Sequence, residues 1–503
     1  MFLYIHIDNA ITELKPKQEN KDMKRDRTKI VCTLSDKLAT ESMLSDMVIK
    51  GMDVARLNFS HATYDSARKM IALIKKVREG LNTPLGIMLD TKGPESRIYG
   101  IKEAFPVKPG DILTVESWPG KDYEKAGTNR IHHFYTNLPD VQELVNIKDK
   151  VLLADGMIEC RVNEITGKMV NLEVLNTGKV KNKAHLSIPG IDYPLPFMSD
   201  KDADDIRFAV ENDLDFIALS FVRNAEDIFT VRDLIYETDP DSRINLISKI
   251  EHRGAIHNLD DIIRHSDGIM VARGDLGVEL EIEEIPIMQK KIINDCYTAG
   301  KSVIVATQML ESMIDHRLPT RAEVSDVANA CFDLASAVML SGETAIGKYP
   351  LLVVETMQKI IQKVEDSYEY EDFLETQLDK IDPTDLTSVL TYSAVASAYR
   401  CNARALVVFS RTGYSARMVA RLRPKIPIHA VTLDEKVYNQ LSIAWGVLPH
   451  LIEDDTDFEV LVKRALSLLK REELVESGDN VVIVAGVPLG IHGKTNMIRI
   501  ESV

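Results

Sequence analysis

The chain has 503 residues, too many for one ordinary hydrophobic core, so about three or four domains are expected. Hydrophobic residues make up 45% and charged residues 27%, and no apolar run is long enough to span a bilayer, which is typical of a globular protein and argues against a membrane protein. The formal net charge of −16 disfavours nucleic acid or an anionic membrane as the main partner.

The N-terminal segment does not look like a targeting signal. Its apolar start, MFLYIHI, is short, meets Asp8 at once, and lacks the basic start and the small-residue cleavage site of a signal peptide. We therefore expect residues 1–27 to form an extension, solvated where Lys, Glu and Asp are dense. The five cysteines are scattered and never spaced as CxxC, which argues against a disulfide framework or a structural zinc site and favours the reducing cytoplasm.

Eight short β-branched segments, each followed by a helical stretch, dominate the chain. They are nearly continuous in apolar residues, as expected for parallel strands that are covered on both faces. The segments are residues 28–33, 54–59, 85–90, 215–221, 244–250, 268–274, 302–308 and 336–342. Eight such units predict an α/β fold with a (β/α)8 TIM barrel over residues 28–91 and 192–368. An open doubly wound sheet is the alternative.

The regular spacing fails once, between the third and fourth segments. About 125 residues separate Asp90 from Asp215, far more than one connecting helix needs. The insert is β-rich, with DILTVES, KVLLADGMIECRV and KMVNLEVLN separated by Gly, Asn and Pro turns. We expect an inserted all-β domain, a small β-barrel, over residues 92–191. Because it leaves the barrel at the C-terminal end of a strand, it should lie over the active-site face as a lid.

A second alternation of helices and strands follows the eighth unit. A charged helix over residues 350–368 leads to a polar linker, EYEDFLETQLDKIDPTD, that closes around Pro383. Beyond it TSVLTYSAVASAY looks helical, ALVVFS, PIHAVT and NVVIVAG look like buried strands, and the chain closes on MIRIESV. This pattern predicts a separate C-terminal α/β domain over residues 384–503.

Polar side chains follow six of the eight predicted barrel strands at the point where each strand ends. A lone carboxylate or serine there is more often a helix N-cap, but its repetition at one end of a barrel favours a functional site. These residues are Arg56, Asn58, Ser60, His61, Asp90, Thr91, Lys92, Lys249, Glu251, Arg273, Gly274, Asp275, Thr307, Gln308, Ser341 and Glu343.

The chemical types of these side chains favour phosphate and cation binding. Glu251 and Asp275 offer the hard oxygen ligands that suit Mg²⁺ or Mn²⁺. Lys249 and Arg56 supply cationic donors for phosphoryl oxygens. Four further oxygen donors, all from the second and third strand ends, carry one formal charge among them, which suits a monovalent cation. They are Asn58, Ser60, Asp90 and Thr91.

Seven motifs in this chain resemble those of the pyruvate kinase family. They are MDVARLNFSH, LDTKGPESR, SKIE, MVARGDLGVE, VATQMLESM, PTRAEVSDVANA and MLSGETAIGKYP. The likeness runs in order from about Thr28 to the C-terminus. It implies a glycolytic kinase that transfers the phosphoryl group of phosphoenolpyruvate to ADP, giving pyruvate and ATP. It also implies Mg²⁺ (or Mn²⁺) and K⁺ as cofactors, and a cytoplasmic homotetramer under allosteric control.

The resemblance implies a role for each matching residue. Lys249 would contact the phosphoryl group, and Arg56 would bridge the phosphates of both substrates. The divalent-metal ligands would be Glu251 and Asp275, and the potassium ligands Asn58, Ser60, Asp90 and Thr91. The substrate carboxylate and the proton path would involve Gly274, Asp275, Thr307, Ser341 and Glu343. The nucleotide contacts would be Asn58, His61, Arg97 and Lys183. Glu95 matches the potassium-dependent branch of the family.

Some positions depart from the family pattern. Ser35–Asp36 replaces a Gly-Pro pair after the first strand, and His252 replaces the Asn that usually follows the metal-binding glutamate. In the insert, ADG at residues 154–156 stands where Asp-Asp-Gly is common, and KAHLSIPG replaces the usual Lys-Gly-Val-Asn run before Pro-Gly. Lys183 is the nearest nucleotide lysine, although its register is shifted.

The C-terminal domain contains SRTGYSA, residues 410–416, which resembles a loop that holds the phosphate of an effector. Its nest would be formed by Ser410, Thr412, Gly413 and Ser415. An ordinary strand-to-helix N-cap is the alternative, and Tyr414 stands where arginine is frequent. The later loop GIHGKTN, with His492 and Lys494, would hold a second phosphate or be solvated. A sugar phosphate is one candidate effector.

Two other functions remain to be weighed against the kinase. Another barrel enzyme of phosphoenolpyruvate or pyruvate, such as an aldolase or a carboxylating enzyme, is disfavoured by Arg97 and by the inserted lid. A catalytically inactive regulatory scaffold is disfavoured because Lys249, Glu251, Asp275 and Thr307 are all present.

Overall fold

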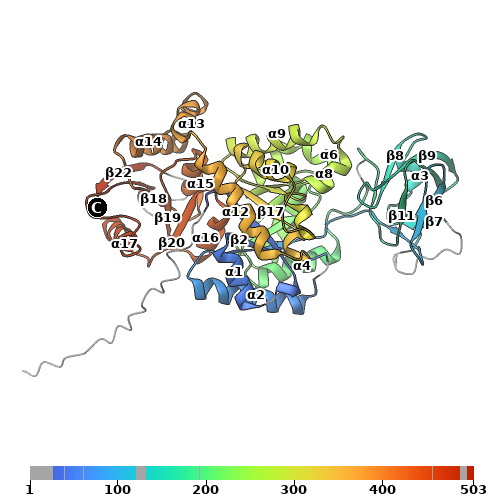
Figure 1. The fold of residues 1–503 in the computed structure, drawn as a ribbon, viewed down its shortest axis with the longest axis horizontal. Helices are drawn as coiled ribbons and strands as arrows, with labels where there is room; N and C mark the ends of the chain where they lie inside the picture. Colours follow the sequence, from blue (N-terminus) through green and yellow to red (C-terminus); the bar gives the residue numbers. More distant parts are fainter. Residues whose placement is uncertain are drawn as a thin grey trace, which may run out of the picture.

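Three structural units follow one another along the long axis of the molecule. In Figure 1 the C-terminal α/β unit is on the left, the barrel is in the centre and the β insert is on the right. The computed structural model describes residues 26–38, 40–60, 62–120, 132–191, 193–455, 457–487 and 495–503. Residues 1–25 of the predicted extension, His61, His492 and Lys494 lie outside these ranges.

The central unit is a closed barrel of eight parallel strands, ordered β1-β17-β16-β15-β14-β13-β3-β2. The strands are β1 (Lys29–Leu34), β2 (Met52–Asn58), β3 (Gly86–Asp90), β13 (Phe216–Leu219), β14 (Asn245–Ile250), β15 (Gly268–Ala272), β16 (Ser302–Ala306) and β17 (Ala337–Leu340). Side chains such as Val31, Met88 and Ile304 fill the interior while helices cover the outside, so the strands are buried on both faces. The predicted barrel is confirmed, and the open sheet is excluded.

The barrel helices begin where a polar side chain accepts the first free backbone N–H groups. Thr40 and Thr63 cap α1 and α2 in this way, and Ser199 and Thr320 form full capping boxes at α4 and α10. The helices are α1 (Glu41–Ile49), α2 (Tyr64–Leu81), α4 (Asp200–Glu211), α5 (Ala225–Thr238), α6 (Arg253–His257), α7 (Leu259–His265), α8 (Arg273–Glu279), α9 (Ile285–Thr298), α10 (Arg321–Phe332), α11 (Gly342–Ala345) and α12 (Pro350–Asp366).

The insert leaves the barrel after β3 and returns before α4, as predicted. Its main sheet has the order β12-β8-β9-β10-β6-β7-β4, and β11 pairs with β5. The elements are β4 (Ile98–Tyr99), β5 (Phe105–Val107), β6 (Ile112–Ser117), β7 (His133–Thr136), α3 (Val141–Leu144), β8 (Lys150–Leu153), β9 (Ile158–Thr166), β10 (Met169–Val174), β11 (Gly178–Val180) and β12 (Leu186–Ser187). Alternating side chains such as Leu113, Val115 and Leu172 form a core of its own, so this domain is β-rich with one short helix.

The C-terminal unit is a five-stranded sheet ordered β20-β19-β18-β21-β22, in which β22 alone is antiparallel to its neighbour. Its elements are α13 (Tyr370–Gln377), α14 (Leu386–Arg400), β18 (Ala405–Phe409), α15 (Tyr414–Arg421), β19 (Ile428–Thr432), α16 (Glu435–Gln440), β20 (Val447–Leu451), α17 (Phe458–Arg471), β21 (Asn480–Ala485) and β22 (Met497–Ser502). The sheet confirms the predicted α/β domain.

Two details of this unit differ from the sequence prediction. The predicted polar linker is wrong, because its first half forms α13, which buries Tyr370 and Leu374 and places Phe373 edge-on against Tyr297. Strand β20 was missed because Pro449 and two partly exposed residues interrupt its apolar pattern, as an edge strand allows.

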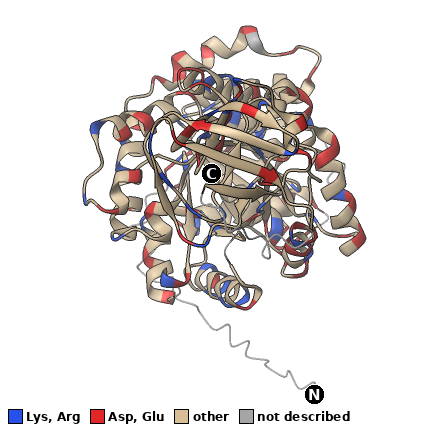
Figure 2. Ribbon diagram, turned by 90° about the vertical axis from the view of Figure 1, so that its right-hand side faces the viewer, with Lys and Arg blue, Asp and Glu red and all other residues tan. Residues whose placement is uncertain are grey.

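The described helices include none that is long and apolar enough to cross a membrane. Figure 2 views the molecule from the side of the insert, and acidic and basic residues are interspersed over the visible elements. In this view the negative charge is not gathered into one acidic face.

Candidate active site

The parallel register brings the predicted strand ends to one mouth of the barrel. Asn58 at the end of β2 lies opposite Asp90 at the end of β3. Ala272 at the end of β15 lies opposite Ala306 at the end of β16, immediately before Thr307. The polar residues after these strands therefore meet above the closed interior, at the face where the insert leaves the barrel.

Asp90 fixes two cationic side chains at this mouth. Its Oδ2 accepts a hydrogen bond from Arg56 Nε at 2.7 Å, and its Oδ1 lies 3.2 Å from Lys249 Nζ. Arg56 also donates from Nη1 to Thr33 Oγ1 at 2.8 Å. Asp90 is 1% exposed, and burial alone would raise its pKa, but Arg56 and Lys249 together hold the pKa below its usual value. Both cations are thus oriented before any substrate arrives.

Lys249 is the most heavily paired cation of the site. Its Nζ lies 2.8 Å from Glu251 Oε1 and donates to Ser220 Oγ at 2.8 Å. Burial would lower the pKa of Lys249, but the carboxylates of Asp90 and Glu251 raise it above its ordinary value. The lysine therefore carries a full positive charge at neutral pH, in a position from which water is largely excluded.

Glu251 and Asp275 form the candidate metal site, since both line one pocket. Glu251 is fully buried, and its Oε2 accepts a hydrogen bond from the backbone N–H of Phe221 at 2.7 Å. Its Oε1 has the Lys249 ammonium nearby but no hydrogen bond of good geometry. Burial raises the pKa of Glu251, only partly offset by Lys249. A divalent cation would compensate this charge. The described residues contain no cluster of three or more His, Cys, Asp or Glu that could hold a metal ion. Mg²⁺ commonly binds through one or two carboxylates and completes its shell with substrate oxygens and water.

The loop after β16 is held in a strained conformation. Thr307 and Gln308 have φ values of 66° and 55°, which a β-branched residue such as Thr307 rarely adopts. Arg273 donates to the Thr307 carbonyl at 2.6 Å and pairs with Asp326 at 2.7 Å. Gly274 N donates to Thr307 Oγ1 at 2.8 Å. The predicted carboxylate-site residues are therefore in contact with each other, and Arg273 holds their loop in place.

Ser341 and Glu343 lie together after β17. The Ser341 hydroxyl is buried and has no hydrogen-bond partner among the described residues. Glu343 accepts hydrogen bonds from the backbone N–H groups of Ser341 at 2.7 Å and Leu310 at 3.2 Å. Glu343 thus holds the backbone from which the free hydroxyl of Ser341 projects.

The sequence analysis missed Ser220, which follows β13. Its hydroxyl donates to the Thr91 carbonyl at 2.6 Å and accepts from Lys249 Nζ at 2.8 Å. Its Oγ is also 3.4 Å from Asp90 Oδ1. The available signal was its place, because Ser220 follows the fourth barrel strand as the other polar residues follow theirs.

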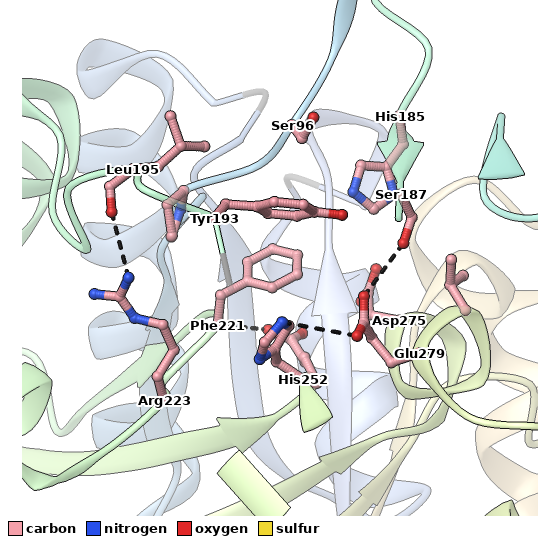
Figure 3. A pocket seen from close by; sticks show the side chains of 13 residues that line it. Ser96, His185, Ser187, Tyr193, Leu195, Phe221, Arg223, His252, Asp275 and Glu279 are labelled. Carbon is pink, nitrogen blue, oxygen red and sulfur yellow. Dashed lines mark hydrogen bonds and ion pairs between the residues drawn. The ribbon is translucent and has the colours of Figure 1, made fainter. Parts of the chain in front are cut away.

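A pocket lies at this mouth between the insert and the barrel, with about 510 Å³ of empty space including its opening to solvent (Figure 3). In Figure 3 the ring of Tyr193 is drawn above the ring of Phe221, and burial raises the pKa of Tyr193 to about 12. Its lining residues are Pro94, Ser96, His185, Ser187, Tyr193, Leu195, Phe221, Arg223, Glu251, His252, Asp275, Val278 and Glu279.

Polar contacts tie the returning end of the insert to the barrel at this pocket. Glu279, at the end of α8, accepts from Ser187 Oγ at 3.2 Å and from Gly190 N at 3.4 Å. His252 Nε2 lies 3.2 Å from the Ile191 carbonyl oxygen and 3.7 Å from Glu279 Oε2. Two of the dashed lines in Figure 3 mark the Ser187–Glu279 and His252–Glu279 contacts. His252 therefore contacts the connection of the insert, a role that its place beside Glu251 in the sequence did not reveal.

The predicted nucleotide residues lie at the edge of the insert. Arg97 pairs with Glu95 at 2.6 Å and donates to the Lys183 carbonyl at 2.6 Å. Lys183 is exposed, with a φ of 62°. Asn58 Oδ1 accepts from Ser60 N at 3.0 Å at the barrel mouth. His61 lies outside the described residues.

The predicted effector loop lies in the C-terminal unit, apart from the barrel mouth. Gly413, the N-cap residue of α15, has a φ of 75°, and no cap hydrogen bond from a side chain is found at this position among the described residues. Ser415 Oγ lies 2.7 Å from Thr495 Oγ1, whereas Thr412 is exposed and Ser410 is buried at the end of β18. The loop therefore leaves the first N–H groups of α15 without a side-chain cap.

Comparison with known proteins gives a consistent result. The family described as "Pyruvate kinase, barrel domain" matches residues 25–354, and "Pyruvate kinase, alpha/beta domain" matches residues 388–501. A pyruvate kinase of Staphylococcus epidermidis RP62A is 40% identical over 485 residues, covering 95% of this chain and 80% of the relative. That of Chlamydia muridarum is 43% identical over 430 residues, covering 85% and 88%. A solved pyruvate kinase from Cryptosporidium parvum superimposes with a TM-score of 0.88 at 36% identity, covering 99% of this chain and all of that one.

Proposed function

Because this chain belongs to the pyruvate kinase family, we propose that Lys249 and Arg56 hold the phosphoryl group that it transfers. The chain is a glycolytic enzyme that moves the phosphoryl group of phosphoenolpyruvate to ADP, giving pyruvate and ATP. The observation that carries the residue assignment is the Lys249 ammonium, buried between Asp90 and Glu251 at the mouth of the barrel.

Lys249 and Arg56 act through electrostatic preorganisation. Phosphoryl transfer spreads negative charge over the equatorial oxygens, so fixed cations in a water-poor site lower the barrier. Asp90 fixes both side chains at 2.7 and 3.2 Å, which removes most of their rotamer freedom in advance. When a substrate phosphate binds, its contacts with water are replaced by contacts with these two cations, which are already in position.

The family generally requires a divalent metal and K⁺, and we propose ligands for each. Glu251 and Asp275 would hold Mg²⁺ or Mn²⁺, which when bound would neutralise the anionic substrate. The place of both carboxylates in one pocket supports this assignment. The proposed potassium ligands are Asn58, Ser60, Asp90 and Thr91. The register pair of Asn58 with Asp90 and the single formal charge of the set support them. Glu95 is consistent with potassium dependence.

We propose that the loops after β15, β16 and β17 bind the substrate carboxylate and deliver the proton to the enolate. We assign the carboxylate to Gly274, Asp275 and Thr307, at the start of α8, where Gly274 N donates to Thr307 Oγ1 and the N-cap residue makes no side-chain cap hydrogen bond. Thr307 and the unpaired hydroxyl of Ser341 are the proposed proton path to the enolate carbon. Glu343 belongs to that path by holding the Ser341 backbone at 2.7 Å.

The insert would close over the nucleotide. Asn58, His61, Arg97 and Lys183 are the proposed nucleotide residues, and closure would exclude water that could otherwise take the phosphoryl group. We place the barrel at residues 28–91 and 192–368, the lid at 92–191, the C-terminal domain at 384–503 and the extension at 1–27. The outermost lid strands, β4 and β12, support these lid limits.

Regulation, assembly and location complete the proposal. The loop at Ser410, Thr412, Gly413 and Ser415 would bind an effector phosphate, with a sugar phosphate as one candidate. The uncapped start of α15 and the left-handed Gly413 support this use. We further propose a homotetramer in the cytoplasm, in keeping with the family and with five cysteines that are all free thiols.

The decisive experiment measures pyruvate formation from phosphoenolpyruvate and ADP with Mg²⁺, with and without K⁺. Turnover stimulated by K⁺ is expected and would support the potassium ligands. Turnover indifferent to K⁺ would remove that cation site and leave the kinase assignment intact. No turnover under either condition, even with sugar phosphates added, would contradict the assignment of activity and favour an inactive scaffold.

A further inference from the structure

Four cationic side chains gather in a second pocket, between the barrel and the C-terminal domain. We call it the interdomain cationic pocket and define it by Lys301, Arg417, Arg421 and Arg423. Figure 1 shows α15, which carries Arg417 and Arg421, between the C-terminal sheet and the barrel helices. No Asp or Glu is among the pocket's lining residues, although the chain as a whole has a net charge of −16.

The barrel-side and α15 cations are held mainly by neutral oxygens. Lys301 Nζ donates to the Ser266 carbonyl at 2.6 Å. Arg421 donates to the Thr298 carbonyl, at the end of α9, at 3.0 Å and to Ser388 Oγ at 2.8 Å. Helix C-terminal carbonyls suit a cation, but they carry only partial charges. Among the described residues no direct ion pair neutralises these cations, so the positive charge is oriented by neutral groups.

Arg423 carries the strongest sign of an incomplete site. It is 4% exposed and donates to the carbonyls of Leu334 and Ala335, and its guanidinium lies 4.4 Å from the centre of the Trp445 ring. Its Nε–H is buried and has no hydrogen-bond partner among the described residues. A buried donor of a charged group without a partner keeps the full cost of its lost hydration, so such a donor indicates an absent acceptor.

The electrostatics of the pocket agree with this geometry. Burial lowers the pKa of Arg423 to about 10. Burial also lowers the pKa values of Lys301 and Arg417, and Arg417 adds to the effect on Lys301 by like-charge repulsion. Asp267 acts on both of these groups from outside the lining without reversing either shift.

We propose that the interdomain cationic pocket binds the phosphate group of a small molecule or inorganic phosphate. Lysine and arginine donors match phosphate oxygens in charge and geometry, and four of them line this pocket. The bound anion would link Lys301 of the barrel with Arg417 of the C-terminal domain. It would therefore brace the two domains against each other.

This site is separate from the SRTGYSA loop. The loop would use N–H groups at the start of α15, whereas the pocket uses side chains on the flank and beyond the end of that helix. Arg417 joins the two regions, because its Nη1 donates to the Thr412 carbonyl at 3.3 Å. Occupancy of the pocket would thus be felt at the loop through Arg417.

The test uses Trp445, which lines the pocket, as a local reporter. The chain has two tryptophans, so a Trp118→Phe background leaves Trp445 as the sole indole. The full-length protein is titrated with inorganic phosphate at constant ionic strength, balanced with sodium chloride, while tryptophan emission is followed. We expect the emission of Trp445 to change and to saturate with phosphate concentration. In a Lys301→Gln/Arg417→Gln variant the apparent affinity for phosphate should be at least about tenfold weaker, since two of the four cations are lost.

Two controls make the result specific. Lys301→Gln alone replaces the double variant if the latter does not fold, as judged by thermal unfolding and by unchanged basal turnover. Ser415→Ala alters the SRTGYSA loop and should leave the Trp445 response intact. Loss of the response in Ser415→Ala, an unaltered response in the pocket variants, or an equal response to chloride alone would each overturn the proposal. Comparing inorganic phosphate with a nucleoside monophosphate and a hexose phosphate then identifies the source of the phosphate by affinity.

Discussion

The barrel mouth and the interdomain cationic pocket bury similar side chains in opposite ways. At the mouth, Arg56 and Lys249 face the carboxylates of Asp90 and Glu251 at 2.7–3.2 Å. In the pocket, Arg423 is buried against carbonyl oxygens and an indole ring. The first arrangement fixes charged groups for a reaction, and the second leaves positive charge for an anion to neutralise. A buried cation is therefore not enough to identify a catalytic site. The two sites are distinguished by whether carboxylates lie beside the cations.

The largest expected effect comes from making the same substitution in both regions. Lys249→Met should lower kcat about 10³-fold or more, because it removes a fixed cation from the transferring phosphoryl group. Lys301→Met, the matched control in the other pocket, should leave kcat within about twofold in phosphate-free buffer. Steady-state pyruvate formation measures both, with thermal unfolding to establish that each variant folds. Near-normal turnover of Lys249→Met would contradict the mechanism.

Removing the shared carboxylate should cost stability as well as activity. Asp90→Asn leaves Arg56 and Lys249 buried with one partner fewer, and we expect a loss of about 3 kcal/mol in the free energy of unfolding. Urea unfolding of the variant and the parent measures the difference. A loss below about 1 kcal/mol would mean that solvent reaches these cations and that the mouth is not preorganised as described.

His429 extends the comparison to a buried basic group that stays neutral. It is 2% exposed, its Nδ1 lies 2.9 Å from His450 Nε2, and burial lowers its pKa to about 4. Because the folded pKa lies below the unfolded value of about 6.5, stability is full above pH 6.5 and falls as pH drops toward 4. Between pH 7 and pH 5, His429 should lower the free energy of unfolding by about 2 kcal/mol.

His429→Gln, which does not titrate but can still hydrogen-bond to His450, is the matched variant. Urea unfolding at pH 7 and pH 5 should show a smaller drop in stability for this variant than for the parent. Equal drops in both proteins would assign the pH dependence to other groups.

The smallest effect is expected in the interdomain pocket. Arg423→Met removes an incompletely paired cation and leaves only neutral backbone carbonyls without their donor. The free energy of unfolding should therefore fall by about 1 kcal/mol. The comparison with Asp90→Asn is made by the same urea titration. A larger loss for Arg423→Met than for Asp90→Asn would reverse the ranking and show that the cation in the pocket is a structural requirement of the fold.

Much of the fold could be predicted because local patterns dictated it. The near-continuous apolar runs of β1 and β15 indicate strands that are covered on both faces. Such a run can be recognised within a short segment, without knowledge of the distant residues that pack on it. Helix α13 was missed because its polar composition hides a small apolar contact, that of Phe373 with Tyr297. Strand β20 was missed because edge strands tolerate a proline.

The candidate site divides in the same way. Residues at strand ends were found because parallel register places them together wherever a barrel forms, as with Asn58 and Asp90. Ser220 was missed although it follows the same rule. Glu279 was missed for another reason: it ends a helix, and its contact with Ser187 spans the connection between two domains, which no local pattern encodes.

The sequence alone determined the order of the barrel strands, the location of most polar residues at the strand ends and the family to which the chain belongs. Each follows from the side chains of a short segment, or from several segments read in order. Only the tertiary structure decided which carboxylate faces which cation and where a cation has none. Arg421 reaches the Thr298 carbonyl from 123 residues away, and Lys249 lies 159 residues from Asp90. Such pairs depend on how closed domains pack, because a charge buried by packing takes the partner that lies within a few ångströms, whatever its place in the chain.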